Sequence, residues 1–494
     1  MTDPQQPFSR REARENAQST AGGATPAGGG PGSVPSRNKV ALIAGALAAA
    51  FLLLGTGAVF AGIAAGKGSQ QPATTPGGTS SSAPTRDVAA DQVAAATIPT
   101  CSISRLTTAS ALKKAFGSVV DVSSGDSLYS LNDTSAQRPA SGEKVLTAAA
   151  AIAVLGPNYR IATQVVDGVT PGSITLIGQG DATLSREPAG KSIYAGAPTM
   201  AALAAATQTA YDAAHPGVPI TQVILDSSYW DPADNWIDSW PRSEQTGGFL
   251  SEVTALQVDG DRANPKFQVS PRGTDPVSRA GNAFVAALGN PNITLVDGHA
   301  ENGAPQLAKV QSQPVKTLVR QMLLASDNTL AEMLARIVSV RENMGGTSGS
   351  LQNAITSALS KYGIDTSDLA ILDGSGESDE DAVPALYMAK LMAAISQKQD
   401  GLQYVADGMP LAGKTGGLTT RFTGANAIAV GKIYAKPGSI ASAYTLSGYL
   451  TARDGTKLAF AFYGIGSGIT TSAQPALDSL ATAVYKCGKN LTTS

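Results

Sequence analysis

The chain has 494 residues, which at roughly 150 residues per unit predicts two to four folded units. Its 36 Lys and Arg residues nearly balance 38 Asp and Glu residues, so no basic surplus points to nucleic acid as a partner. With two His and two Cys residues in all, a metal site built from His and Cys is not expected. The same scarcity argues against a Ser-His-Asp triad, so a serine enzyme with this sequence would need another base.

The segment before the folded body predicts a tail, a membrane span and a stalk. Residues 1–39 are polar and rich in Gly, Pro, Ala and Ser, which predicts a disordered tail. Residues 40–66 form a run of 27 without a charge, long enough to cross a hydrocarbon layer of about 30 Å as a transmembrane helix. Arg37 and Lys39 precede this run, so the positive-inside rule places the tail in the cytoplasm. Residues 67–95, rich in Ser, Thr, Pro and Gly, predict a flexible linker.

These segments predict a single-pass protein of the cell membrane with an extracytoplasmic body. The alternative is secretion after signal cleavage, because Ala58-Val-Phe-Ala61 fits a cleavage site. The two cysteines agree with an oxidising exterior, since Cys101 opens the body and Cys487 lies near its end. We therefore expect a disulfide between them, the alternative being two separate buried thiols.

The body reads as short strands and helices in alternation. A helical pattern at 105–116 precedes an expected β-hairpin of strands 118–122 and 127–131 around a Gly turn. Residues 141–155 are apolar nearly all round, which predicts a buried central helix. The other expected elements are strands at 174–177, 222–225, 432–436, 443–452 and 457–465, and helices at 199–214, 314–325, 384–397 and 473–487, with one more helix ending at 340.

Strands at both ends of the body with helices between them predict one α+β domain with a split antiparallel sheet. We assign residues 96–160 and 306–494 to this domain. The pattern loosens in residues 161–305, which predicts an inserted, mainly β region that interrupts the domain.

Ser141 and Lys144 are the first chemically suggestive pair. They are three residues apart on the expected helix, so both side chains lie on one face. A serine hydroxyl is a weak nucleophile until a base takes its proton, and a desolvated lysine can be that base. A Ser-x-x-Lys tetrad by itself is weak evidence, because a helix cap with a surface lysine gives the same pattern.

Two later motifs strengthen the pair. Ser326-Asp327-Asn328 precedes a helix, and a downstream Lys on a strand would complete the order Ser-x-x-Lys, Ser-x-Asn, Lys-Thr-Gly. With these motifs the body resembles the class C low-molecular-mass penicillin-binding proteins, the bacterial serine D-Ala-D-Ala carboxypeptidases and endopeptidases. The segments that carry the resemblance are Arg138–Ala151, Gly178–Ser185, Ser326–Leu334, Leu372–Gly376, Met409–Gly413 and Leu446–Leu450. The resemblance implies a penicillin-binding-protein/β-lactamase-like transpeptidase fold.

The third motif has two candidate lysines. Lys414 opens a literal Lys-Thr-Gly, whereas Lys436 opens Lys-Pro-Gly. In the family about eight residues separate this motif from an Ala/Ser-Gly-Tyr strand, and only Lys436 stands at that distance from Ser447. We therefore assign the motif to Lys436 and keep Lys414 as the alternative. Pro437 then replaces the usual Thr, which removes a hydroxyl and a backbone donor and weakens the expected binding of a substrate carboxylate.

The resemblance implies a serine D-Ala-D-Ala carboxypeptidase/endopeptidase that acts on peptidoglycan stem peptides through an acyl-enzyme and binds β-lactams. It implies Ser141 as nucleophile, Lys144 as base, Ser326 as proton relay, Asn328 as a holder of the peptide and Lys436 as the cation for a carboxylate. Gly438 and Ser439 would bind substrate, with the Ser439 N–H in the oxyanion hole. No metal or organic cofactor is implied. Because of Pro437, the alternative is a catalytically degenerate wall-binding or scaffolding homologue.

Overall fold

The structure is a computed structural model that describes residues 101–492. The predicted tail, membrane span and linker at 1–39, 40–66 and 67–95 lie outside the described residues and stay predictions. Among the helices of residues 101–492, none has both the length and the apolar character needed to span a membrane.

The described residues form helices and short strands in alternation. The helices are α2 (Ser104–Thr107), α3 (Glu143–Leu155), α4 (Met200–Ala214), α5 (Ser243–Thr246), α6 (Pro276–Leu288), α7 (Val315–Ala325), α8 (Asn328–Arg341), α9 (Leu351–Ser360), α10 (Ala385–Gln397), α11 (Gln403–Ala406) and α12 (Ala473–Cys487). The strands are β1 (Cys101–Ser102), β2 (Lys114–Asp121), β3 (Ser127–Leu131), β4 (Ala162–Asp167), β5 (Ser173–Gly178), β6 (Gln222–Asp226), β7 (Thr294–Asp297), β8 (Gln306–Gln311), β9 (Ile433–Ile440), β10 (Ala443–Thr451), β11 (Lys457–Ile465) and β12 (Leu491–Thr492).

One antiparallel sheet is built from both ends of the described chain. β9, β10 and β11 pair in the order β11-β10-β9, and β2 pairs with β3. β2 lies along β11 in the opposite direction, because Lys113 bridges to Ile465 at one end and the Val122 N–H donates to the Lys457 carbonyl at the other. The predicted split sheet is therefore present, and β9 is the last strand on its side.

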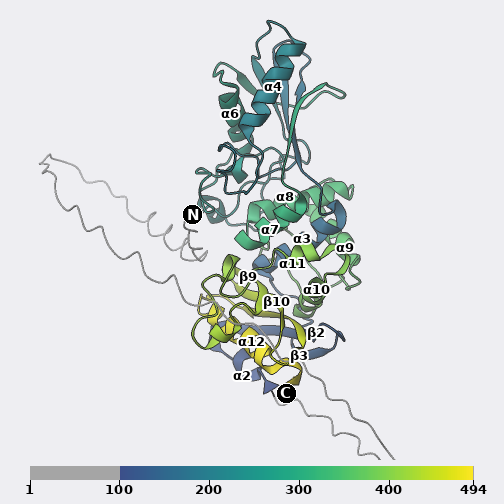
Figure 1. Cartoon of the computed structure of the whole chain (residues 1–494), viewed down its shortest axis with the longest axis vertical. Helices are drawn as coiled ribbons and strands as arrows, with labels where there is room; N and C mark the ends of the chain where they lie inside the picture. Colours follow the sequence, from purple (N-terminus) through teal and green to yellow (C-terminus); the bar gives the residue numbers. More distant parts are fainter. Residues whose placement is uncertain (1–100, 493–494) are drawn as a thin grey trace, which may run out of the picture. The chain divides into compact units, whose positions relative to one another are not determined.

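Helices cover both faces of this sheet (Figure 1). α10 packs on β2, β10 and β11, and α12 packs on β10 and β11. Side chains alternate along β11: Ala461 and Tyr463 join the core that contains α3, α7, α8 and α10, whereas Phe460 and Phe462 join the core that contains α12. Alternate side chains of a strand point to opposite faces of its sheet, and apolar residues on both faces are typical of a fully buried strand. The helical layers of α10 and α12 therefore lie on opposite faces of the sheet.

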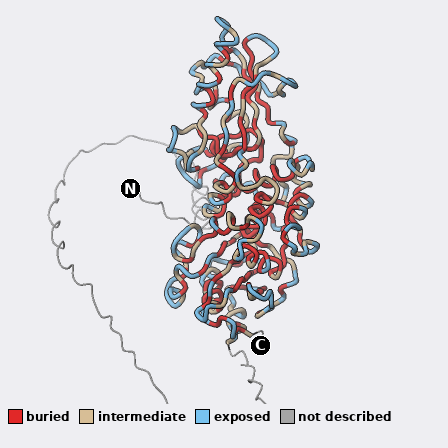
Figure 2. Tube along the Cα trace, turned by 45° about the vertical axis from the view of Figure 1, so that its right-hand side comes forward, coloured by how far each residue is buried: buried red, intermediate tan, exposed pale blue. Residues whose placement is uncertain are grey.

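α3 is the central helix of the larger core. Its residues from Glu143 to Ile152 are all buried, and α7, α8 and α9 pack around it. The buried stretches of the trace gather inside this helical layer, and exposed stretches follow the loops around it (Figure 2). Four alanines, Ala148 to Ala151, let the neighbouring helices approach closely. The predicted buried helix over 141–155 is confirmed, with a 3₁₀ turn at Ala140–Gly142 leading into it.

The region between α3 and α7 contains a second sheet, in the order β7-β6-β5-β4-β8. β4 is antiparallel to β5 and β8, whereas β5, β6 and β7 run parallel. Parallel neighbours need crossover connections, which α4 and α6 supply, and both helices pack on the sheet through one apolar core. We predicted a mainly β insertion, and the crossovers make it mixed α and β instead. The predicted boundaries at 161 and 305 stay predictions.

Most of the other predicted elements are confirmed, including the hairpin β2–β3, α4, α7, α10, α12 and strands β5, β6, β9, β10 and β11. The helix predicted at 105–116 is wrong. The chain forms only the single turn α2 and a 3₁₀ turn at Ser110–Leu112 before β2 begins at Lys114. The physical reason is tertiary: Phe116 and Val120 face the core of α3, Val119 faces the core of α12, and only a strand can serve both.

A disulfide links Cys101 to Cys487, with the Cα atoms 5.5 Å apart. Next to it, β1 pairs in parallel with β12. The disulfide predicted from the sequence is therefore present, and it ties the start of the described body to its last helix.

Candidate active site

Ser141 lies in the 3₁₀ turn that leads into α3, and Lys144 lies in the first turn of the helix. The Lys144 Nζ donates to Ser141 Oγ at 3.2 Å and to the Ser375 carbonyl at 2.6 Å. Lys144 is fully buried and Ser141 nearly so. Burial disfavours the charged form of an amine, and a hydroxyl in contact with a desolvated amine has the arrangement of a nucleophile and its base.

A tight loop at residues 373–378 holds the Ser375 carbonyl on Lys144. The buried Asp373 carboxylate accepts N–H groups from four successive residues, Ser375, Gly376, Glu377 and Ser378, at 2.5–3.1 Å. Gly376 has φ 74° and lies so close to the turn of Ser141 that an added Cβ would stand 1.8 Å from the Ala140 carbonyl oxygen. Ala140 itself has φ 47°, a conformation that non-glycine residues rarely adopt. The loop therefore packs directly against the turn that carries Ser141.

The Ser326-Asp327-Asn328 motif joins α7 to α8. Ser326 ends α7 in the left-handed conformation with φ 53°, and Asp327 caps α8 by accepting from the Leu330 N–H at 3.0 Å. The Lys436 Nζ donates to Ser326 Oγ at 2.9 Å, and the Asn328 amide donates to Glu377 Oε2 at 3.0 Å. Ser326 and Asn328 thus both contact residues brought from distant parts of the chain.

Lys436 and Lys414 have different surroundings. Lys436 is 1% exposed on β9 and reaches Ser326. Lys414 is exposed in the loop that precedes β9. The structure thus brings Lys436, and not Lys414, to the segments that carry Ser141 and Ser326.

Pro437 leaves the pairing of β9 with β10 intact. The Ala435 N–H donates to the Pro410 carbonyl at 2.9 Å, so it points away from β10. Residues two apart on an antiparallel strand direct their N–H groups to the same side, so position 437 also faces away from β10. The missing N–H of Pro437 therefore costs no ladder bond, and the Ser439 N–H points to the same outer side.

Gly438 lets β9 approach the turn of Ser141. An added Cβ would stand 2.3 Å from Thr445 Oγ1 and 3.0 Å from the Ser141 nitrogen. Thr445 Oγ1 in turn donates to the Pro139 carbonyl at 2.8 Å, which fixes the turn to β10. A side chain at position 438 would push the strand away from the serine.

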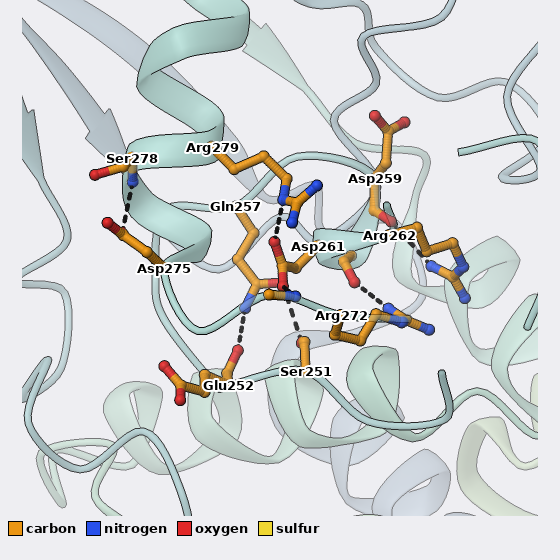
Figure 3. A network of polar contacts seen from close by, with 12 residues as sticks. Ser251, Glu252, Gln257, Asp259, Asp261, Arg262, Arg272, Asp275, Ser278 and Arg279 are labelled. Carbon is orange, nitrogen blue, oxygen red and sulfur yellow. Dashed lines mark hydrogen bonds and ion pairs between the residues drawn. The ribbon is translucent and has the colours of Figure 1, made fainter. Parts of the chain in front are cut away.

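Asp327 and Thr329 face the inserted region, since Asp327 accepts from Arg262 and Thr329 Oγ1 accepts from the Ser251 N–H at 3.2 Å. Asp327 accepts from Arg262 at 2.8 Å, from Tyr194 at 2.9 Å and from Gln268 at 3.1 Å. Arg262 is completely buried and also donates to the Asp259 carbonyl. Figure 3 shows the contact of Arg262 with the Asp259 carbonyl and, in the same polar cluster, Arg272 and Asp261. The inserted region therefore holds the loop that presents Ser326 and Asn328.

Comparison with known proteins identifies the chain. The model of the D-Ala-D-Ala carboxypeptidase 3 (S13) family matches residues 100–277 and 260–484. The chain belongs to this family. A carboxypeptidase of Mycobacterium tuberculosis is 35% identical over 392 residues, which cover 76% of this chain and 81% of that protein. The carboxypeptidase DacB of Mycolicibacterium smegmatis is 32% identical over 378 residues, covering 75% and 80%.

The fold of this S13 carboxypeptidase is that of solved penicillin-binding proteins. Penicillin-binding protein 4 from Haemophilus influenzae superposes with a TM-score of 0.63 at 19% identity, over 76% of this chain and 96% of that chain. The predicted family and the predicted transpeptidase-like fold are confirmed. The predicted enzyme class, a D-Ala-D-Ala carboxypeptidase of the hydrolases, is confirmed as well.

Three residues of the S13 site were missed in the sequence. Asp373 lies in the Leu372–Gly376 segment that we singled out, but its role as the acceptor for a whole loop is visible only in the structure. Glu377 follows that segment directly, so an acidic residue next to a recognised motif was an available signal. Arg262 carries no local signal, because its partner Asp327 is 65 residues away in the chain.

A group of buried acids lies around the loop that contacts Lys144. Burial, and then the nearby Asp373, raise the pKa of Glu332 from 4.5 to about 8. Burial is also the main cause that raises the pKa of Glu143 and of Asp381 well above the ordinary value. Both Glu332 oxygens accept from the Gly374 N–H, at 3.0 and 3.1 Å, so this acid supports the loop that holds Lys144.

Stability is expected to fall with rising pH because of Glu332. Its pKa is higher in the folded than in the unfolded chain, so the folded state retains an extra proton between about pH 4.5 and about pH 8. The contribution of Glu332 to the free energy of unfolding is fully present at low pH. It declines by up to about 1.4 kcal/mol per pH unit between pH 4.5 and pH 8 and is constant above that window. Urea unfolding at pH 6 and pH 8 should show a smaller decline in Glu332→Gln than in wild type. Equal declines in both proteins would contradict this assignment.

Proposed function

We propose that this chain cleaves D-Ala-D-Ala stem peptides of peptidoglycan through an acyl-enzyme on Ser141. The contact that carries the proposal is the 3.2 Å hydrogen bond between Lys144 Nζ and Ser141 Oγ in a buried site. In the neutral amine form Lys144 takes the Ser141 proton while Oγ bonds to the carbonyl carbon of the penultimate D-Ala. The N–H groups of Ser141 and Ser439 stabilise the negative charge that develops on the carbonyl oxygen.

The remaining steps use the residues around Ser326. The proton passes through Ser326, which Lys436 contacts at 2.9 Å, to the amine of the leaving D-Ala as the amide bond breaks. Asn328 holds the peptide, and Lys436 attracts the terminal carboxylate. Water then hydrolyses the ester and restores Ser141. β-Lactams are substrate mimics in this scheme and acylate the same oxygen.

The proposal also includes the location of the protein in the cell membrane. Residues 40–66 anchor it in the membrane, and the catalytic body faces the cell wall. The disulfide between Cys101 and Cys487 supports this placement, because such bonds persist in oxidising compartments outside the cytoplasm.

Mass spectrometry of the intact protein after incubation with benzylpenicillin tests the proposal. Wild type is expected to gain the mass of one penicilloyl group, and Ser141→Ala is expected to gain none. Lys436→Ala should acylate much more slowly than Lys414→Ala, since only Lys436 reaches Ser326. Absence of an adduct on wild type at high drug concentration would overturn the proposal in favour of the non-catalytic wall-binding alternative.

Pro437 is the observation that favours that alternative, and its effect can be measured directly. Pro437→Thr restores a hydroxyl and an N–H on the outer side of β9, where a substrate carboxylate would bind. One hydrogen bond to a charged group contributes about 1.5–3 kcal/mol, so we expect KM for a D-Ala-D-Ala peptide to fall roughly 10–100-fold. Pro437→Val is the matched control, because it restores the N–H without the hydroxyl. Equal KM values for the two variants would show that the hydroxyl contributes nothing.

A further inference from the structure

Glu377 carries a buried carboxylate beside the Ser326-Asp327-Asn328 motif. Its side chain is 4% exposed, and Oε2 accepts from the Asn328 amide at 3.0 Å. A buried carboxylate is costly unless it is hydrogen-bonded, so its retention beside Asn328 calls for a physical reason. None of the roles proposed above for acylation involves it.

The loop geometry places Glu377 next to the nucleophile. Lys144 Nζ contacts both Ser141 Oγ and the carbonyl of Ser375, and Ser375 is only two residues before Glu377. Two residues span at most about 7 Å of chain. Gly376, between them, touches the Ala140 carbonyl and would place a Cβ 2.8 Å from the Glu143 Cβ. The Glu377 backbone thus lies beside the turn of Ser141, and its side chain reaches across to Asn328.

Asp373 fixes this position. It accepts from the Glu377 N–H at 3.1 Å and from the Trp240 indole N–H at 2.7 Å. The carboxylate of Glu377 therefore stands on a braced loop and is oriented by the Asn328 amide. A carboxylate oriented by a second hydrogen-bonding group, on a loop that also contacts the base of the reacting serine, is a candidate general base.

We propose that Glu377 is the general base that activates water for hydrolysis of the acyl-Ser141 ester. This inference rests on the proposed function, because it needs the acyl-enzyme. Glu377 takes one proton from a water molecule while the water oxygen bonds to the ester carbonyl carbon. The bond from that carbon to Ser141 Oγ then breaks, the proton passes from Glu377 through Lys144 to Oγ, and the peptide leaves with a free carboxyl group. One water is consumed and the serine hydroxyl is restored.

A purely positioning role for Glu377 predicts a different pattern in two variants. Glu377→Gln keeps an oxygen that accepts from the Asn328 amide but cannot take a proton from water. Glu377→Leu loses both properties. If Glu377 only orients Asn328, the Gln variant resembles wild type and the Leu variant is impaired. If Glu377 is the base, both variants are impaired in deacylation.

The decisive experiment follows the penicilloyl adduct over time after a pulse of benzylpenicillin and removal of excess drug. We expect the adduct to form on Glu377→Gln and then to decay at least about 100-fold more slowly than on wild type. Glu380→Gln is the matched control, since Glu380 is an exposed glutamate two residues beyond the loop, and its adduct should decay like that of wild type. Decay of the Gln adduct within threefold of wild type would overturn the inference.

A second measurement separates the base from the rest of the site. Hydroxylamine attacks esters without needing a general base, so it should accelerate release from the Gln variant far more, in relative terms, than from wild type. If hydroxylamine accelerates both proteins equally, water activation is not the missing step and the inference fails. A wild-type protein that forms no adduct would refute the proposed function itself, which distinguishes the two failures.

Discussion

Replacing Lys144 with methionine is expected to lower kcat/KM for a D-Ala-D-Ala peptide by about 10⁴-fold, at the upper end of the effect of a general base. The reason is that Lys144 Nζ is in hydrogen-bond contact with Ser141 Oγ. Methionine fills a similar volume, and loss of the donor to the buried Ser375 carbonyl is expected to cost about 1–3 kcal/mol, so the fold should persist with reduced stability. Steady-state release of D-Ala measures the activity, and circular dichroism together with the urea midpoint measures the fold.

Lys414→Met is the matched control for this prediction. It makes the same substitution at an exposed lysine that stands in a Lys-Thr-Gly sequence. We expect its kcat/KM to stay within threefold of wild type. A Lys144→Met protein that retains a tenth of the wild-type activity would exclude Lys144 as the base.

Replacing Arg262 with methionine is expected to destabilise the protein by about 3–5 kcal/mol, the cost of leaving one partner of a buried ion pair alone. Burial raises the pKa of Asp327, but the neighbouring Arg262 and Arg272 outweigh it and hold the pKa well below its usual range. Asp327 caps α8, and among the described residues its one ion pair is with Arg262, at 2.8 Å. The Arg262→Met variant loses this ion pair. Urea unfolding and the rate of penicillin acylation measure the two consequences.

Two variants make the Arg262 prediction specific. Arg186→Met removes an arginine of the same network that is partly exposed and pairs with Asp259 rather than Asp327, so acylation should change little. Adding Asp327→Asn to Arg262→Met removes the stranded charge and should recover a large part of the stability. Acylation unchanged in Arg262→Met would show that the inserted region does not position Ser326 and Asn328.

The sequence predicted the parts of the site that lie close together in the chain. Ser141 and Lys144 are three residues apart, and helical geometry alone brings their side chains to one face. Ser326 to Asn328 stand at a helix start for a similar local reason. The choice of Lys436 over Lys414 depends on motif spacing within the family. In the structure Lys436 reaches the site by its contact with Ser326, which lies 110 residues earlier in the chain.

The sequence was least informative where an element serves two cores at once. At 105–116 the apolar residues follow a helical period, yet the chain from Lys114 onward is needed beside β11, so the expected helix is cut short and β2 begins there. The loose pattern of the inserted region predicts mainly β structure. Its parallel strands, which require α4 and α6 as crossovers, follow only from the order of the sheet.

The family, the central helix with its serine and lysine, the pairing of the cysteines and most strands of the split sheet follow from the sequence alone. These features depend on local periodicity, on motif spacing or, for the disulfide, on the presence of two cysteines in all. The contact of Glu377 with Asn328, 49 residues away, and the ion pair of Arg262 with Asp327 are visible only in the folded chain. Such contacts join side chains whose separation in the chain carries no period, so folding alone brings them within hydrogen-bond distance.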